Sequence, residues 1–241
     1  MIASFKYNFI FVRTKKTAST AVELGLSTIC GPDDIIAPIG RGQELLRAQS
    51  GVHPRNFNKD PRVERDLIAA IKTGRGKLIR EAGMRNRQTN GCTGHMRIAK
   101  VKEWVSDDFW NKSYKFTTER HPYEKALSLA RFRYKGDEFT QRVSFEDFLD
   151  RTVKEEAQVY GGFKVYSIGG KSVMDFYLLH DTLADDIAKL RKTLDLPEFE
   201  LPRARSTRTD KKPARDVLTD EQKEFIYASC KAEFDLFGWK R

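Results

Sequence analysis

The sequence predicts an α/β protein in which helices cover both faces of a central parallel sheet. Short apolar segments rich in aromatic and β-branched residues alternate along the chain with longer segments whose apolar residues recur at helical spacing. The 241 residues are enough for a sizeable core, and 39% of them are hydrophobic. No internal repeat and no linker-like segment divides the chain, so residues 1–241 are expected to form a single domain.

The first predicted unit is a strand, a polar loop and a helix. Residues 7–13 (YNFIFVR) predict a buried strand because the apolar run is short, and residues 17–26 (TASTAVELGL) predict a helix with one apolar side. The segment 31–94 is rich in glycine, proline, asparagine and arginine, and only residues 63–72 in it predict a helix. It carries twelve lysine and arginine residues against seven acidic ones. We therefore expect a basic, partly irregular insert that contacts the substrate.

The second half of the chain alternates more regularly between the two kinds of element. The predicted elements are a helix over 98–105, a strand over 113–119, helices over 122–134 and 145–153, a strand over 173–179 and a helix over 182–194. A last helix starts with the capping pattern Thr219-x-x-Gln222 and extends towards Phe234. Strands that alternate with helices predict a parallel sheet.

Charge and composition limit the partners and the compartment. A net charge of +10 suits polyanions such as nucleic acid or small molecules with several phosphates, and it also suits a solvated basic surface. The three cysteines form no CxxC pair, and no histidine or carboxylate cluster has ligand spacing, so neither disulfides nor a metal are expected. No apolar run is long enough for a membrane span or a signal peptide, which predicts a cytoplasmic location. No feature of the sequence indicates an oligomeric state.

The loop RTKKTAST, between the first predicted strand and helix, is a candidate anion site. Backbone N–H groups and the helix dipole converge at such a loop. It contributes two lysines and three hydroxyl side chains, namely Lys15, Lys16, Thr17, Ser19 and Thr20. No glycine lies between Arg13 and Glu23, so the loop is not the GxxxxGK[ST] loop of nucleotide kinases, and a kinase is disfavoured. An ordinary turn with solvated lysines is the alternative interpretation.

The segment FIFVRTKKTASTAVE resembles the strand, 5'-phosphosulfate loop and helix of carbohydrate-type sulfotransferases, whose loop reads PKTAGT. The matching residues are Lys16, Thr17, Ala18 and Thr20, while Lys15 replaces the proline and Ser19 the glycine. The resemblance implies a P-loop NTPase-like sulfotransferase fold, 3'-phosphoadenosine 5'-phosphosulfate (PAPS) as donor and 3',5'-adenosine bisphosphate (PAP) as product. It also implies that residues 15–20 bind the donor and that Lys16 stabilises the leaving phosphate.

A second segment, FTTERHPYEKALSLARFRY, resembles the strand, RNPYDR motif and serine-bearing helix that bind the 3'-phosphate in that family. The matching residues are Arg120, Pro122, Tyr123 and Ser128. Arg120 and Ser128 are therefore candidate ligands of the 3'-phosphate, for which a guanidinium offers a planar fork of donors. The alternatives are a salt bridge of Arg120 with Glu119 or Glu124, and a hydrogen bond of Ser128 with its own helix backbone.

Between these segments, GCTGHMRIAKVKEW resembles the family segment in which a strand ends in Gly-His before a helix, most closely in uronosyl-type heparan sulfate 2-O-sulfotransferases. The likeness continues into ARFRYKGDE, and the C-terminal strand and helices also resemble those of the family. His95 is by this resemblance the candidate general base, and a packing or hydrogen-bonding histidine is the alternative. The basic loop 201–215 is expected either to fold over the ligands or to be solvated.

These features together predict a sulfotransferase that moves a sulfo group from PAPS to an acceptor hydroxyl by in-line displacement. A saccharide is the expected acceptor, because a basic insert suits an anionic sugar. The alternative from another class is a non-catalytic nucleic-acid-binding protein, which the net charge supports. The spread of basic residues along the chain and the lack of an aromatic–basic RNA-binding signature count against it.

Overall fold

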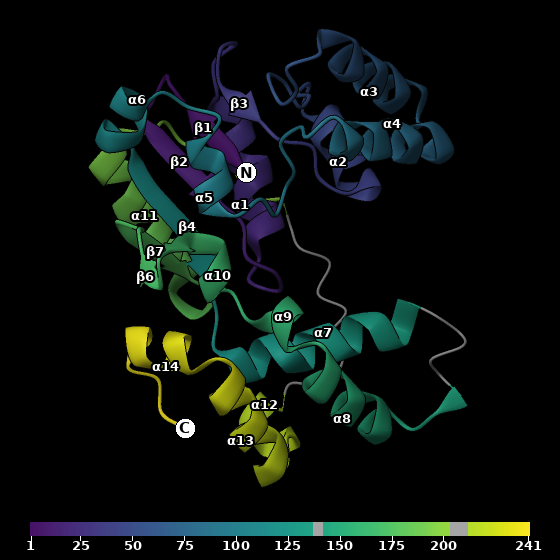
Figure 1. The fold of residues 1–241 in the computed structure, drawn as a ribbon, viewed down its shortest axis with the longest axis vertical. Helices are drawn as coiled ribbons and strands as arrows, with labels where there is room; N and C mark the ends of the chain where they lie inside the picture. Colours follow the sequence, from purple (N-terminus) through teal and green to yellow (C-terminus); the bar gives the residue numbers. More distant parts are fainter. Residues whose placement is uncertain (137–141, 203–211) are drawn as a thin grey trace.

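The computed structural model describes residues 1–136, 142–202 and 212–241 and has an α/β architecture with a five-stranded sheet at its centre (Figure 1). In spatial order the strands are β3 (Ile35–Ile36), β1 (Ile2–Ser4), β2 (Phe9–Val12), β4 (Tyr114–Glu119) and β7 (Phe176–Leu179). Strands β2, β4 and β7 are parallel, whereas β1 is antiparallel to both of its neighbours. The sheet is therefore mixed, and the prediction of a parallel sheet holds only for these three strands.

The antiparallel edge arises from a strand that the sequence pattern did not indicate. β1 is three residues long, and it turns back into β2 through residues 5–8, where Asn8 adopts a left-handed φ of 53°. A strand this short shows no periodicity of its own, and its pairing with β2 and β3 stabilises it. The strand predicted over 173–179 begins only at Phe176, because Asp175 exchanges hydrogen bonds with the backbone of Lys115 at the edge of the ladder.

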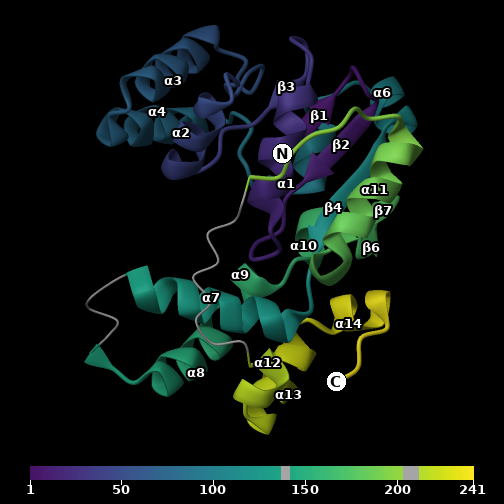
Figure 2. The same ribbon diagram turned by 180° about the vertical axis from the view of Figure 1, so that it is seen from behind.

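Helices cover both faces of the sheet, as predicted. On one face lie α1 (Ser19–Ile29) and α11 (Leu183–Leu194), which follows a 3₁₀ turn over His180–Thr182; on the other lie α5 (Ile98–Lys102), α6 (Asp107–Lys112) and α10 (Phe163–Tyr166). Side chains alternate along β2, so that Phe9 and Phe11 pack with α1 and α11 while Ile10 and Val12 pack with α5. Figure 2 shows α11 against β7. The helix predicted over 98–105 is shorter, and α6 was not predicted.

The insert over 31–94 is more regular than expected. It contains β3 and three helices, α2 (Arg41–Gln49), α3 (Pro61–Thr73) and α4 (Gly76–Gln88). The helix predicted over 63–72 is confirmed as α3, but α2 and α4 were not predicted. Gly76 and Gly83 lower the helix propensity of α4, yet Ile79 and Ala82 pack into the cluster that contains Leu67 of α3. Tertiary packing of these apolar side chains outweighs the propensity.

A second helical layer lies below the sheet in Figure 1 and has its own apolar cluster. Its helices are α7 (Pro122–Gly136), α8 (Phe145–Glu155), α9 (Ala157–Tyr160), α12 (Ala214–Val217), α13 (Asp220–Ser229) and α14 (Lys231–Phe237). The helices predicted over 122–134 and 145–153 are confirmed. The capping box of Thr219 and Gln222 is present, but the last predicted helix breaks at Cys230 into α13 and α14. A small hairpin of β5 (Ser167–Ile168) and β6 (Lys171–Ser172) precedes β7.

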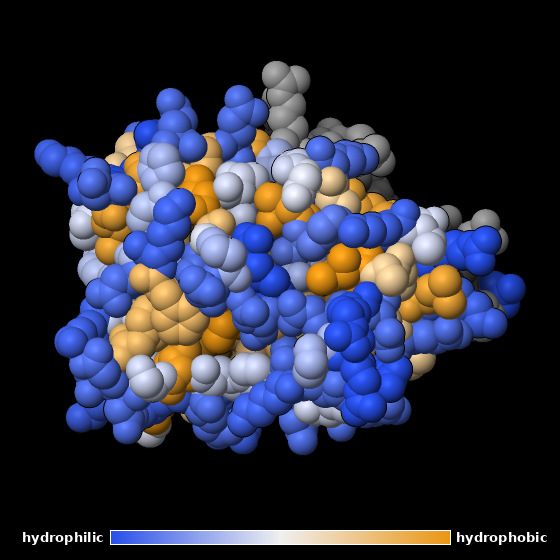
Figure 3. Space-filling model, turned by 90° about the horizontal axis from the view of Figure 1, so that it is seen from above, coloured by the Kyte–Doolittle hydropathy of each residue, from blue (hydrophilic) through white to orange (hydrophobic). Residues whose placement is uncertain are grey.

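The surface is mostly hydrophilic when it is viewed from the top of Figure 1, and hydrophobic side chains form separate patches on it (Figure 3). Within the described ranges, no helix combines the length and the apolar character needed to cross a bilayer.

Candidate anion site at the ends of β2 and β4

The parallel pairing of β2 with β4 brings two predicted ligand segments to the same edge of the sheet. Val12 pairs with Thr117, so the loop that leaves β2 and the segment that follows β4 start next to each other. Lys16 is half-buried on the first segment and Arg120 is half-buried on the second. Burial, together with the nearby charge of Arg120, lowers the pKa of Lys16 to about 8. The fold thus holds two cationic groups together that are far apart in the sequence.

The backbone of the loop has two left-handed residues, Lys16 with a φ of 64° and Ala18 with a φ of 63°. Left-handed residues within a loop turn successive N–H groups towards a common point, which is the geometry of an anion-binding nest. Ser19, which stands where the resembled loop has glycine, is the first residue of α1. Its helical backbone requires no glycine, so the departure from the family pattern is compatible with the loop.

The N-terminus of α1 has no side-chain cap. Ala18 is the N-cap residue, and it has no polar side chain to accept from the first N–H groups of the helix. A helix start of this kind favours an anion, because the unpaired N–H groups and the positive end of the helix dipole point the same way. Lys15 is exposed beside it and adds a further positive charge.

The hydroxyl groups of the loop bind to the protein itself. Thr17 is fully buried, and its Oγ1 lies 2.7 Å from Oγ1 of Thr118 on β4. The Ser19 hydroxyl donates to the carbonyl of Thr14 over 2.7 Å. Thr20 Oγ1 accepts from Nη2 of Arg13 over 2.6 Å. These bonds fix the shape of the loop, and a direct role of the three hydroxyl groups in donor binding stays a prediction.

Arg120 forms the salt bridge that the sequence left open. Its Nη2 lies 2.8 Å from Oε2 of Glu124, one turn along α7, and its backbone N–H donates to Oε1 of Glu119. A guanidinium has five N–H donors in a planar fork, a geometry that suits phosphate oxygens as well as carboxylate oxygens. Ser128 is half-buried one further turn along the same helix, so Glu124 and Ser128 share a face.

His95 lies next to the loop, although the segment before it is not a strand. Residues 91–97 have no regular structure, and Cys92 donates its N–H to the carbonyl of Phe57, earlier in the insert, in place of a sheet ladder. His95 Nδ1 is 3.2 Å from the carbonyl oxygen of Arg13. A carbonyl only accepts, so Nδ1 carries the proton and Nε2 keeps its lone pair. His95 is an exposed residue overall, but partial desolvation of its ring beside the loop, together with the charge of Arg13, lowers the pKa of His95 to about 4, which keeps the ring neutral at pH 7.

Sequence reasoning missed a buried ionic cluster under this loop. Arg13 Nε lies 3.0 Å from Oε2 of Glu23 on α1, and Oε1 of Glu23 lies 3.2 Å from Nη2 of Arg47 on α2. Arg47 also pairs with Glu44 over 2.9 Å. The cluster joins the end of β2, the loop helix and the insert. One signal was available, since Glu23 falls between the apolar residues of the buried side of α1.

A second buried pair lies directly before Arg120. Lys125 Nζ is 2.7 Å from Oε1 of Glu119, and neither side chain is exposed to solvent. Glu119 also accepts from the backbone of Arg120, so this pair fixes the end of β4 and the start of α7 together. From the sequence alone, Glu119 was only a possible partner of the Arg120 side chain.

Three further features are the absence of a metal cluster among the described residues, a surface pocket and the C-terminal loop. Within 1–136, 142–202 and 212–241, no group of three or more histidine, cysteine or acidic residues is placed to hold a metal ion. A surface pocket of about 630 Å³ lies between α1, α2 and residues 198–202, and no candidate site residue lines it. Residues 203–211 of the loop 201–215 lie outside the described residues, as do the last two of ARFRYKGDE.

Comparison of the chain with protein-family models, with curated proteins and with solved structures finds no match in any of the three. The geometry of this site is therefore the basis for its function. Its elements are a loop with an uncapped helix start, two converging cations and a neutral histidine, all at one edge of the sheet.

Proposed function

We propose that this protein transfers a sulfo group from PAPS to the hydroxyl of an acceptor, with a P-loop-like sulfotransferase fold. The observation that carries the proposal is the convergence of Lys16 and Arg120 at the ends of two adjacent parallel strands. Two cations that repel each other are costly to hold together, and a ligand with two anionic groups removes that cost. A nucleotide with a 5'-phosphosulfate and a 3'-phosphate has this charge distribution.

The residues present fit such a donor. The left-handed backbone at Lys16 and Ala18 and the uncapped start of α1 suit the 5' group, with Lys15 and Lys16 as charged ligands. Arg120 lies just before α7 and Ser128 lies on its second turn, and both suit the 3'-phosphate. The 3'-phosphate is the part of the ligand that separates this donor from ATP and ADP.

Bound PAPS supplies the sulfo group and a phosphate leaving group. Lys16, still largely protonated at pH 7 with a pKa of about 8, offers its ammonium group to the negative charge that grows on the leaving oxygen. His95 offers the unprotonated Nε2 to the acceptor hydroxyl, because its Nδ1 proton is held by the Arg13 carbonyl. The ionic contact of Arg13 with Glu23 holds that carbonyl and α1 in one arrangement.

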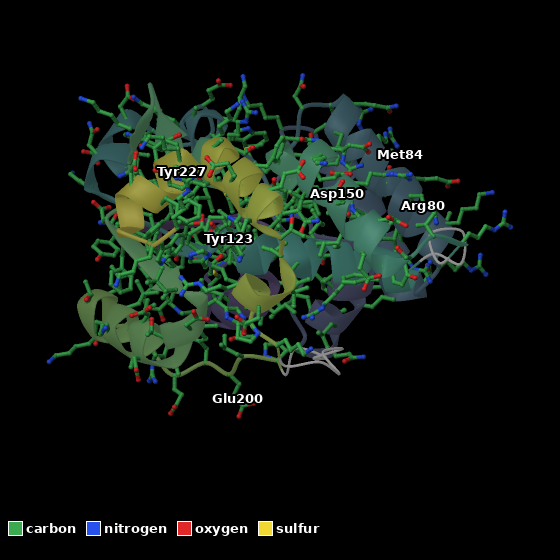
Figure 4. All side chains as sticks on the ribbon, turned by 90° about the horizontal axis from the view of Figure 1, so that it is seen from below. Arg80, Met84, Tyr123, Asp150, Glu200 and Tyr227 are labelled. Atoms are coloured by element: carbon green, nitrogen blue, oxygen red, sulfur yellow. The ribbon has the colours of Figure 1, made fainter. Side chains whose placement is uncertain are left out.

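The acceptor we propose is a saccharide. Exposed cations of the insert suit an acidic sugar polymer, and Arg80 lies at the outer edge of the molecule on α4 (Figure 4). Lys77, Arg80 and Arg87 recur at helical spacing along the exposed side of α4, and none of them forms a salt bridge with another described residue.

Calorimetric titration with PAP tests the donor site. Wild type is expected to bind PAP, and Lys16→Ala to weaken binding by about 10- to 100-fold, since a charge-assisted contact contributes roughly 1.5–3 kcal/mol. Lys192→Ala is the matched control. It removes an exposed lysine of α11, outside the candidate site, and the variant should bind PAP as wild type does. A wild-type protein that binds no PAP would contradict the proposal. Transfer of labelled sulfo groups to saccharide, lipid and phenol pools then identifies the acceptor.

A second candidate function is polyanion binding by α4 without catalysis, as in a nucleic-acid-binding protein. The same exposed cations on α4 favour it. It predicts salt-dependent binding of random nucleic acid and no thermal shift with PAP. The first proposal predicts a thermal shift with PAP, and that shift should depend on Lys16.

A further inference from the structure

An exposed aromatic ring lies against the lysine of the candidate donor site. The Nζ of Lys16 is 4.2 Å from the ring centroid of Phe132 on α7, which is within the range of a cation–π contact. Phe132 is 68% exposed, so it contributes little to the apolar cluster on the other side of α7. Packing therefore does not account for a phenylalanine at this position.

The ring is in line with the predicted 3'-phosphate ligands. Phe132 follows Ser128 by four residues and Glu124 by eight, so the three side chains lie on one face of α7. Glu124 in turn pairs with Arg120, which lies at the end of β4 just before this helix face. The lysine of the first ligand segment thus contacts the same helix face that carries the second segment.

Several groups act on the charge of Lys16. Arg120 approaches from the end of β4 and opposes the charge, and burial opposes it as well. Lys15 precedes it in the loop, and Glu124 on α7 is already paired with Arg120. The negative face of the Phe132 ring acts in the opposite direction and attracts the ammonium group.

We propose that Phe132 is a positioning residue that holds the ammonium group of Lys16 at the mouth of the donor site and favours its charged form. The inference rests on the proposed function, because it assigns Phe132 to the binding of the same donor. Without the ring, Lys16 gains rotamer freedom and loses an attraction that offsets the repulsion from Arg120. The anion would then meet a lysine that is less well placed and less fully charged.

The test is PAP affinity from pH 7 to 9.5 for wild type, Phe132→Leu and Phe132→Tyr. Phe132→Leu should weaken PAP binding about two- to fivefold at pH 7, the size of a cation–π contact at an exposed site. Affinity needs the protonated lysine, so in wild type it falls as the pH rises through about 8. In Phe132→Leu the fall should begin at lower pH, whereas Phe132→Tyr should keep the wild-type profile. Phe5→Leu, an exposed ring 43% accessible and far from this contact in sequence, is the matched control and should change neither quantity.

The outcomes separate this inference from the proposed function. If wild type binds PAP and Phe132→Leu shows the same affinity and the same pH profile, Phe132 has no positioning role while the donor site stands. NMR titration of the Lys16 ammonium without ligand gives a second measurement that does not depend on PAP. A Lys16 pKa that is equal in wild type and Phe132→Leu would overturn the inference even if no donor bound.

Discussion

Replacement of Lys125 by methionine should destabilise the protein strongly, because it leaves a buried carboxylate without its counter-charge. Lys125 and Glu119 are both 0% exposed and lie 2.7 Å apart, and the second carboxylate oxygen of Glu119 has no hydrogen-bond partner among the described residues. Removal of one partner from such a pair costs about 3–5 kcal/mol. For a chain of this length the loss corresponds to a fall in Tm of roughly 6–20 °C.

Urea unfolding and thermal unfolding measure this loss of stability, and two further variants show whether it comes from the unpaired charge. Lys154→Met removes a lysine that pairs on the surface with Asp150 of α8, where both side chains are 42% exposed, and with Glu221 (Figure 4). It should cost less than about 1 kcal/mol. The double change of Lys125→Met with Glu119→Gln removes both charges and should recover most of the stability, since the amide oxygen that replaces the carboxylate would still accept from the backbone of Arg120.

The result that would refute this reasoning is a Lys125→Met variant no less stable than Lys154→Met. A double variant as unstable as the single one would also contradict it, because the loss would then come from packing and not from an unpaired charge. In the single variant PAP affinity should fall as well, because Glu119, which holds the backbone of Arg120, loses the lysine that fixes its position.

Further predictions concern the loop and the histidine. Ala18→Gly should stabilise the protein by up to about 1 kcal/mol in urea unfolding, because Ala18 has a φ of 63° and a left-handed conformation costs a residue with a Cβ about 1–2 kcal/mol. Ser19→Gly, at a helical position with a hydroxyl bond to Thr14, should instead destabilise, and the opposite order of the two variants would contradict the loop geometry. His95→Ala should lower kcat about 10²- to 10⁴-fold once an acceptor is known. Because a base must be unprotonated and the pKa of His95 is about 4, wild-type kcat/KM should persist down to about pH 5 and fall towards pH 4. An acidic limb near the ordinary histidine pKa of about 6.5 would show that partial desolvation and Arg13 do not lower this pKa.

Local pattern alone determined the elements whose signals are complete within one segment. The helices α3, α7, α8 and α11 show apolar residues at helical spacing, and α13 begins with its own capping box, so neighbours in the chain suffice to form them. The strand β4 and the loop after β2 were also predicted correctly, since a short apolar run followed by polar residues has few other structures available.

Elements that depend on contacts between distant residues could not be predicted in this way. β1 is stable only as a partner of β2 and β3, and α4 forms despite two glycines because its apolar side packs with α3. The strand that the family resemblance implied before Gly94 does not form, because the N–H of Cys92 donates to Phe57 and not to a neighbouring strand. Pairing of this kind is decided by the whole fold, which a pattern in one segment does not contain.

The candidate site divides in the same way. The sequence by itself predicted Lys16 and Arg120 as candidate ligands of an anion, each at the end of a strand. Only the tertiary structure decided that the two strands are adjacent and parallel, which brings these cations together and lowers the pKa of Lys16. It also decided the partners of each group, namely Glu124 for Arg120, Phe132 for Lys16 and the Arg13 carbonyl for His95, because such partners are chosen by distance in space and by burial.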